Sequence, residues 1–483
     1  MTKIEKGCAL FTDFYSLSMA QGYWKKKCDK PVIFEMFFRR LPFDSGYAIF
    51  AGLGTLLEQL ESLAFSDSDI AYLNDTGLFD PAFTEYLKTF RFQGSLWAMD
   101  EGTVVFPNEP LIRVEGSLIE CQLIEGLLLN IINFQSLIAT KACRVWLASG
   151  KGSVMEFGLR RAQGADGALS ASRAAYIGGA CGTSNTLAGK VFGIPVMGTM
   201  AHSWVMSFSS EAEAFDAYAD LYPDRSVFIL DTYDTLKSGI NNAIKTGGRL
   251  AEMGKKFGVR LDSGDIQYLS TKVRERLDAA GFNDARILVS NDLDEYIIET
   301  LVKDGAPVNG WGVGTRMVTG DKEAAFSGIY KLAARMEDGQ GFVPVIKLSD
   351  NPQKTTNPGV KQVWRIRDEG GAAMADVISL DDEEPPQPGG RYAFWHPSAD
   401  YRHFYHSVKN AQAMLKVKLD KGKITEPLPS LADIHKNMAL SLEQFDSTYK
   451  RLLNPHIYKV SITEKMRDLK LDLIRKRLGD RNS

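Results

Sequence analysis

The chain has 483 residues, more than one ordinary hydrophobic core holds, and this length predicts two or three domains or a barrel with additions. Hydrophobic residues make up 44% and charged residues 24%, which is typical of a soluble globular protein. The net charge of −3 argues against a basic surface for nucleic acid, so we expect no nucleic-acid partner.

We also expect no membrane segment and a cytoplasmic location. The first residues lack the apolar core of a signal peptide, and the longest apolar stretch, 127–134, is interrupted by Asn130 and Asn133. The five cysteines are scattered without paired spacing, which favours reduced thiols over a disulfide framework or a zinc site.

Residues 1–135 predict an α+β domain. Residues 32–39 (VIFEMFFR) have the composition of a strand, and 53–63 are helical in pattern. The segment 94–117 is rich in glycine, proline and β-forming residues, which predicts an antiparallel module with tight turns. A long, mostly apolar helical pattern follows over 119–149.

Residues 136–345 predict an irregular parallel α/β barrel. Helix-like stretches separate short apolar runs at intervals of roughly 25–40 residues, as right-handed βα units require. Strands this apolar are covered on both faces. The runs are 153–157, 194–198, 227–231, 258–262, 287–292 and 308–315.

Residues 346–483 mix short β runs with turns and end in a basic tail, 464–483, that predicts an amphipathic surface helix. We expect this segment to pack on the N-terminal one, so that the two build a smaller α+β domain beside the barrel. His396, Asp400, His403 and His406 cluster in HPSADYRHFYHS. A helix would place His403 and His406 on one face as a metal pair, but a solvated or interface cluster is the favoured interpretation.

Polar residues follow each barrel strand at the point where it ends. Because parallel strands end at the same rim, we expect them to converge there. Arginines and glycine-flanked amides bind phosphate, aspartates such as Asp262 and Asp265 hold Mg²⁺ through water, and His202 is the only histidine in the first 395 residues. The set comprises Arg160, Arg161, Thr199, His202, Asp231, Asp234, Arg260, Asp262, Ser263, Asp265, Ser290, Asn291, Asp292, Gly312, Gly314 and Thr315.

No GxxxxGK[ST] sequence and no strand-to-helix GxGxxG is present. The rim therefore predicts a site for a phosphorylated, magnesium-bound small molecule that uses neither a P-loop nor a dinucleotide fold.

Six motifs make the chain resemble the nicotinate phosphoribosyltransferases, a type II phosphoribosyltransferase family. They are FTDFYSLSMAQGY (11–23), EGTVVFPNEPLIRVEG (101–116), EFGLRRAQGADGA (156–168), GTSNTLAGKVFGIPVMGTMAHSW (182–204), RLDSGD (260–265) and GVGTRMVT (312–319). The resemblance implies condensation of nicotinate with 5-phosphoribosyl 1-diphosphate to nicotinate mononucleotide and pyrophosphate, coupled to ATP hydrolysis, in NAD biosynthesis by salvage. It also implies Mg²⁺ and a homodimer with shared active sites.

The resemblance also implies roles for single residues. His202 matches the histidine that is transiently phosphorylated, and Asp262, beside Arg260, is the second catalytic residue. Arg160 should bind phosphate and Arg260 the nicotinate carboxylate, with Thr199 against the substrate. Phe157 and the partner subunit's Tyr15 should enclose the pyridine ring. The residues expected to hold the 5-phosphate are Ser290, Asn291, Gly314 and Thr315.

Asn185 bears on which pyridine is used. The nicotinamide-using relatives carry an aspartate at the matching place, where a carboxylate would repel nicotinate and an asparagine would not. Two alternatives stay open at this point. One is a phosphoribosyltransferase of the same fold that uses nicotinamide or quinolinate, and the other is an inactive barrel that serves as a scaffold.

Overall fold

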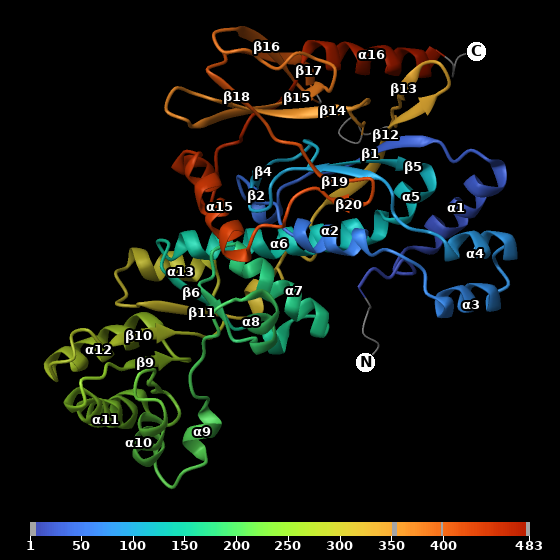
Figure 1. Cartoon of the computed structure of the whole chain (residues 1–483). Coiled ribbons are helices and arrows are strands. Elements are labelled where there is room, and N and C mark those ends of the chain that lie inside the picture. The colour runs from blue at the N-terminus through green and yellow to red at the C-terminus, as the bar shows by residue number, and fades with distance from the viewer. Residues whose placement is uncertain (1–5, 350–354, 398, 480–483) are drawn as a thin grey trace. The chain divides into compact units, whose positions relative to one another are not determined.

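The computed structural model describes residues 6–349, 355–397 and 399–479 (Figure 1). The chain forms two compact units, Met1–Leu137 with Ala325–Ser483, and Ile138–Ala324. The unit made from the two ends of the chain is the larger one, whereas the sequence predicted a smaller α+β domain. The predicted segments 1–135 and 346–483 already hold more residues than 136–345, so the size was misjudged. The unit also gains strand β12 (Gly328–Glu337), which the prediction assigned to the barrel but which pairs with β1 (Pro31–Phe38).

A seven-stranded sheet whose neighbouring strands all run antiparallel forms the centre of the first unit. Its order is β13-β12-β1-β5-β3-β19-β20. The predicted antiparallel module at 94–117 is confirmed, because β3 pairs with β5. The remaining strands of this sheet are β3 (Ser95–Ala98), β5 (Ile112–Ser117), β13 (Gly341–Pro344), β19 (Lys416–Asp420) and β20 (Lys423–Ile424), and a separate pair joins β2 (Ala48–Ile49) to β4 (Val104–Val105).

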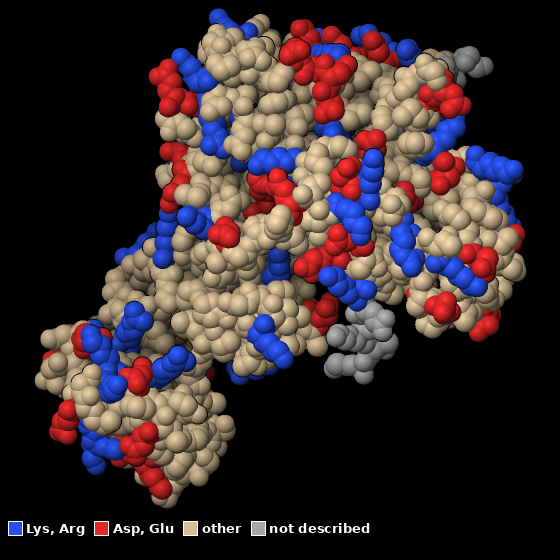
Figure 2. All heavy atoms as spheres, in the orientation of Figure 1, with Lys and Arg blue, Asp and Glu red and all other residues tan. Residues whose placement is uncertain are grey.

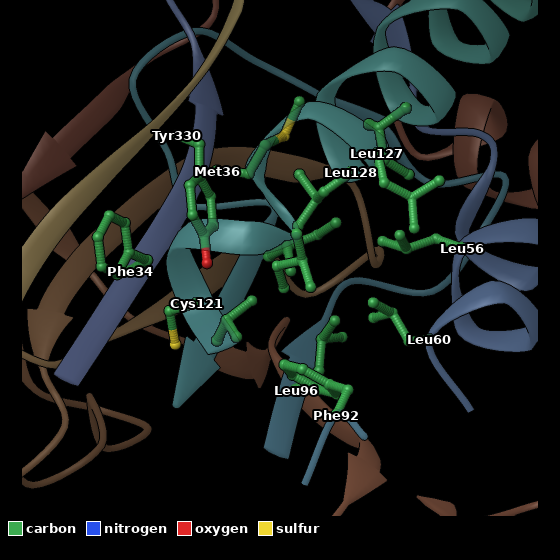
Figure 3. Packing of buried hydrophobic residues seen from close by; sticks show 14 of the residues in the cluster. Phe34, Met36, Leu56, Leu60, Phe92, Leu96, Cys121, Leu127, Leu128 and Tyr330 are labelled. Carbon is green, nitrogen blue, oxygen red and sulfur yellow. The ribbon is translucent and has the colours of Figure 1, made fainter. Parts of the chain in front are cut away.

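Helices of the first unit share a large apolar core with this sheet (Figure 3), and α16 packs on β15 and β16 of a second sheet. Phe34 of β1 stacks on Tyr330 of β12 with 4.7 Å between ring centroids, and Leu56 and Leu128 reach the same core from helices. The predicted long helix is confirmed as two pieces that meet at Ile124. The helices are α1 (Phe14–Lys26), α2 (Leu53–Glu61), α3 (Asp67–Asp75), α4 (Pro81–Lys88), α5 (Leu118–Leu123), α6 (Glu125–Ala148), which runs on into the second unit, α15 (Leu431–Glu443) and α16 (Glu464–Gly479).

The histidine cluster lies in a second sheet of the first unit, ordered β17-β16-β21-β15-β14-β18. The metal pair that a helix would have created from His403 and His406 is not formed. The stretch is a β-hairpin in which His403 packs on Trp395 and His406 packs on Phe394. The side chain of Asp400 lies outside the described residues. These strands are β14 (Lys361–Arg367), β15 (Ala373–Leu380), β16 (Arg391–His396), β17 (Ala399–Ser407), β18 (Asn410–Ala413) and β21 (Val460–Ile462).

The second unit contains a six-stranded parallel sheet in the order β7-β6-β11-β10-β9-β8 (Figure 1). The predicted strands are confirmed as β6 (Ser153–Glu156), β8 (Val227–Ile229), β9 (Gly258–Leu261), β10 (Arg286–Val289) and β11 (Gly310–Val313), with β7 (Gly182–Thr183) at one edge. The connecting helices are α7 (Gly164–Ile177), α8 (Thr186–Phe192), α9 (His202–Met206), α10 (Glu211–Leu221), α11 (Ile240–Glu252), α12 (Ile266–Ala279), α13 (Glu295–Lys303) and α14 (Thr315–Val318).

A closed barrel is not confirmed. Strands β7 and β8 stand at opposite ends of the sheet, and no hydrogen-bonded ladder joins them in the described part of the chain. The strand predicted at 194–198 contributes only one parallel bridge, between Thr183 and Val196. Pro195 brings no backbone N–H to that edge, and the residues after Ile194 are exposed, so no ladder forms there.

Acidic and basic side chains are interspersed on the face shown in Figure 2, in keeping with the small net charge. Within the described ranges, none of the helices combines the length and the apolar content that a bilayer crossing needs.

Candidate active site at the ends of the parallel strands

A cavity of about 470 Å³ lies where the strands of the parallel sheet end, and every residue that lines it belongs to the second unit. Polar tips of β6, β9, β10 and β11 meet there, as the sequence predicted. The lining residues are Phe157, Leu159, Arg160, Arg161, Ser184, Gly198, Thr199, Met200, Ala201, His202, Arg260, Asp262, Ser290, Asn291, Asp292, Gly312, Gly314 and Thr315.

The segment after β6 forms one wall. Phe157 continues the strand by donating its N–H to the Val313 carbonyl at 2.8 Å. Its ring lies directly against Gly312, where an added Cβ would come within 2.6 Å of the ring. A side chain at Gly312 would therefore displace Phe157, which leaves a flat aromatic surface in the wall. Arg160 follows in a short 3₁₀ turn, Leu159–Arg161.

Arg260 gives the cavity a positive charge. Burial lowers the pKa of Arg260 and the nearby Arg160 lowers it further, while Asp262 and Asp231 act in the opposite direction. The guanidinium donates to the Thr199 hydroxyl, but its Nε has no hydrogen-bond partner among the described residues. Two neighbouring guanidinium groups on the wall of one cavity make a site that suits an anion.

His202 opens helix α9 and lies between two polar partners. Its Nδ1 is 3.1 Å from the Thr232 hydroxyl, and its Nε2 is 3.6 Å from Oδ2 of Asp262. The Ser290 hydroxyl donates to the other oxygen of Asp262. The His202 side chain is 39% exposed, so the imidazole is oriented by its neighbours and still open to a ligand.

The tips of β10 and β11 form the third wall. Asn291 has a φ of 97°, a left-handed conformation that is uncommon outside glycine, and its carbonyl accepts from Leu293 N–H at 2.6 Å. At Gly314 an added Cβ would lie 3.0 Å from the Phe157 carbonyl oxygen, so only glycine fits comfortably between the two walls. Strained backbone of this kind is concentrated at ligand sites.

Six predicted residues do not line the cavity: Tyr15, Asn185, Asp231, Asp234, Ser263 and Asp265. Asn185 is buried and caps α8, with Oδ1 accepting from Ala188 N–H at 3.2 Å. Asp265 caps α12 through Tyr268 N–H at 3.0 Å. Tyr15 lies on α1 in the first unit and is 46% exposed. A residue before a helix can cap it or face a ligand, and here Asn185 and Asp265 cap.

Sequence reasoning missed Thr232, the hydroxyl that contacts His202, and Ser184, which lines the cavity. The signal for Thr232 was its place directly after Asp231 at the end of β8. Ser184 offered a weaker signal, because β7 is only two residues long. The sequence also did not point to Glu156 in β6 or Thr183 in β7. In the structure the Thr183 hydroxyl donates to the Glu156 carboxylate beneath this rim.

Paired arginines, a histidine beside a carboxylate and a glycine-lined rim at the ends of parallel strands define an α/β enzyme that binds phosphorylated or carboxylated small molecules. Comparison with known proteins makes this class more specific. Residues 153–369 match the nicotinate phosphoribosyltransferase family, residues 10–133 match the N-terminal domain of these enzymes, and residues 360–470 match their C-terminal domain. The chain belongs to the nicotinate phosphoribosyltransferase family of enzymes.

Individual relatives cover nearly the whole chain. The chain is similar to the nicotinate phosphoribosyltransferase of Bacillus subtilis, with 43% identity over 94% of this chain and 93% of the relative. The human nicotinate phosphoribosyltransferase is 35% identical over 95% of each chain. The crystal structure of the human enzyme superposes with a TM-score of 0.84 at 32% identity, covering 96% of this chain and 99% of that one.

The structure of a nicotinate-nucleotide pyrophosphorylase from Pyrococcus furiosus has a TM-score of 0.70 at 20% identity and covers 92% of this chain and 97% of that one, which shows a shared fold.

Proposed function

We propose that this enzyme condenses nicotinate with 5-phosphoribosyl 1-diphosphate to give nicotinate mononucleotide and pyrophosphate, in the salvage branch of NAD biosynthesis. The observation that carries the proposal is Arg260, which lines the cavity beside a second cation, Arg160. Nicotinate is an anion, and a half-buried guanidinium selects it over neutral nicotinamide. Quinolinate has a second carboxylate and would need a further cation.

The reaction forms one bond and breaks one bond at the anomeric carbon of the ribose. The pyridine nitrogen bonds to that carbon, the bond to the diphosphate oxygen breaks, and its electron pair leaves with pyrophosphate. Phe157 supports the ring, and Arg260 with Thr199 fixes the carboxylate, so that the nitrogen is aligned for attack. Arg160 stabilises the charge that develops on the leaving group.

The 5-phosphate binds at the tips of β10 and β11. Gly314 and Thr315 bring backbone N–H groups to the wall without a side chain at Gly314, and the Ser290 hydroxyl would exchange its bond to Asp262 for one to the phosphate. Asn291 supports this wall through its left-handed conformation.

Mg²⁺ fits the carboxylates of this rim. Asp231 and Asp262 supply oxygen donors, and Oδ1 of Asp231 is buried without a hydrogen-bond partner in the described part of the chain. No group of three or more His, Cys, Asp or Glu side chains that suits a metal is found among the described residues. These two carboxylates would therefore hold the ion together with substrate diphosphate and water, and Mg²⁺ would neutralise charge on the leaving pyrophosphate.

ATP phosphorylates His202 in this proposal. The γ-phosphoryl group passes to a ring nitrogen, ADP leaves with the proton balance taken up by solvent, and water later removes the phosphate. The phosphohistidine adds negative charge at the cavity mouth and organises Mg²⁺ and the neighbouring Thr199–His202 segment around the substrates.

A homodimer completes the site. Phe14, Tyr15 and Met19 are 60%, 46% and 37% exposed and recur at helical spacing along α1, and Phe11, just before the helix, is 37% exposed. A stripe of this kind supports a contact with a second copy, in which Tyr15 closes over the partner's pyridine ring. The scattered cysteines favour a reducing compartment, and we place the enzyme in the cytoplasm.

The test of the phosphohistidine uses γ-labelled ATP and Mg²⁺. The wild type and His456→Ala should take up acid-labile label, because His456 is an exposed histidine outside the cavity, whereas His202→Ala should take up none. Equal labelling of all three proteins would remove His202 from the reaction.

Pyrophosphate release with nicotinate, nicotinamide and quinolinate tests the substrate. Nicotinate should be turned over most efficiently, and nicotinamide as the best substrate would contradict the role of Arg260. Absence of release with all three pyridines would favour an inactive scaffold.

A further inference from the structure

Glu156 is a buried carboxylate beneath the floor of the cavity. It is the last residue of β6, its side chain is 1% exposed, and it does not line the cavity. In the ranges that the structure describes, Glu156 forms no ion pair with a lysine, arginine or histidine. Burying a carboxylate without a cation is costly, so its hydrogen bonds must offset a large desolvation penalty.

Three donors from three segments supply those hydrogen bonds. Oε1 accepts from Gly158 N–H, at the start of the turn that carries Arg160. Oε2 accepts from the Ser172 hydroxyl of α7 at 2.8 Å and from the Thr183 hydroxyl of β7 at 2.5 Å. One carboxylate therefore ties the segment after β6 to a helix and to the neighbouring strand.

The network continues to Asn185. Thr183 Oγ1 accepts from Asn185 N–H at 3.0 Å, and Asn185 Nδ2 donates to Ser172 Oγ at 3.2 Å. Ser184, between Thr183 and Asn185, lines the cavity and donates its N–H to the Glu156 carbonyl at 2.9 Å. The buried polar groups thus join two walls of the cavity from below.

We propose that Glu156 is a positioning residue for this reaction, which it serves through the Phe157–Arg161 segment and through Thr183. The inference rests on the proposed function, because Phe157 and Arg160 are the side chains whose place it sets. An apolar residue would pack this site at lower cost, as Val154 and Met155 do earlier in β6. The carboxylate instead fixes the register of the two walls, since only an acceptor with two oxygens satisfies all three donors.

Thr183→Val and Thr246→Val form a matched pair that tests the inference. Both threonines are buried in the second unit, and each donates its hydroxyl to a carboxylate, Thr183 to Glu156 at 2.5 Å and Thr246 to Asp216 at 2.7 Å. Thr246 lies on α11 away from the cavity lining. Each variant loses the same hydroxyl from the same degree of burial; Thr183 Oγ1 in addition accepts from Asn185 N–H, and Asp216 in addition pairs with Arg249.

The readouts are kcat and KM for both substrates, with melting temperatures for each variant. Thr183→Val should lower kcat/KM by about tenfold or more and raise KM for both substrates, while Thr246→Val should stay within about twofold of the wild type. Glu156→Gln keeps the side-chain size and one acceptor, and should fall between the wild type and Thr183→Val. Equal kinetics for the two threonine variants would overturn the inference.

Calorimetric binding of inorganic pyrophosphate with Mg²⁺ separates this inference from the proposed function. A wild type that does not turn over nicotinate contradicts the proposed function alone. If Thr183→Val then binds pyrophosphate more weakly than Thr246→Val, Glu156 still positions the Arg160 segment. If both variants bind pyrophosphate equally, the positioning role is wrong.

Discussion

Two arginines, one in each unit, show how differently the two units use charge. Arg365 of the first unit is 1% exposed, and it joins β14 to β15 by two bonds to Asp376, at 2.9 and 2.7 Å, with a third to the Val104 carbonyl. Burial would lower its pKa, but Asp376 outweighs burial and raises it. Arg260 of the second unit shares the rim with another cation, keeps an unused Nε, and has a lowered pKa.

The set of partners around each guanidinium distinguishes a charge that stabilises the fold from one that is placed to bind a ligand. Arg365 has its counterion inside the protein, so nothing is left for a ligand to satisfy. Arg260 has neighbouring carboxylates, but it lines a cavity beside a second guanidinium, an arrangement that suits an anionic ligand. Buried charge alone therefore does not identify a site, whereas two neighbouring cations on the wall of a cavity do.

The largest expected effect is the loss of stability when Arg365 is replaced. Arg365→Met should lower the free energy of unfolding by about 3–5 kcal/mol, because Asp376 would remain buried without its cation. The unpaired Asp376 would lie beside Glu109, a second buried carboxyl whose pKa is already raised by burial and by Asp376. Urea unfolding measures this loss. Lys255→Met, which removes an exposed partner of Asp224, should change stability little, and equal losses for both variants would refute the distinction.

Replacement of Arg260 should affect catalysis and leave the free energy of unfolding nearly unchanged. Arg260→Ala should lower kcat/KM for nicotinate by about 100- to 1,000-fold, since the carboxylate loses a charged partner in a half-buried site. Arg286→Ala is the matched control, because Arg286 is exposed at the opposite end of the neighbouring strand β10. A loss of stability in Arg260→Ala without a kinetic defect would assign Arg260 a structural role.

Lys470 in the first unit tests whether a buried cation without a carboxylate destabilises the fold. Burial and Lys361 lower its pKa to about 8, and its Nζ donates to the Asn357 side-chain oxygen at 2.9 Å and to the Pro397 carbonyl at 2.8 Å. In the unfolded chain the pKa of a lysine is about 10.4. Between about pH 8 and about pH 10.4 the unfolded chain therefore binds more protons than the folded chain, so the free energy of unfolding rises as the pH increases through this window.

The free energy of unfolding of the wild type should therefore gain about 2 kcal/mol relative to Lys470→Met between about pH 7.5 and about pH 9.5. Urea unfolding of both proteins at the two pH values measures the gain. A constant difference between them would mean that the pKa of Lys470 is the same in the folded and unfolded chains.

The smallest effect concerns the choice of pyridine. Asn185→Asp should keep the cap on α8, because both residues cap well, but it loses the Nδ2 donor to Ser172; kcat/KM should therefore fall for nicotinate and nicotinamide alike, with their ratio changed by less than about tenfold. The reason is that Asn185 does not line the cavity. A larger change in the ratio would restore the direct role that the sequence predicts for Asn185.

Much of the site was visible in the sequence because burial leaves a clear pattern. Parallel strands covered on both faces read as apolar runs, so the polar residues that follow them stand out, and their common direction brings Arg160, His202, Arg260 and Ser290 to one rim. Asn185 and Asp265, which the sequence predicted as site residues, instead cap α8 and α12, since asparagine and aspartate directly before a helix commonly act as caps.

The sequence by itself determined the elements, the parallel sheet and the rim of polar residues, because these follow from local periodicity and from burial. Only the tertiary structure decided which rim residues face the cavity, that β12 joins the first unit, and that β7 and β8 remain the two ends of the sheet. The tertiary structure also placed Glu156 beneath the cavity, tied to Ser172 and Thr183. Such features depend on hydrogen bonds between residues far apart in the chain, which no local pattern encodes.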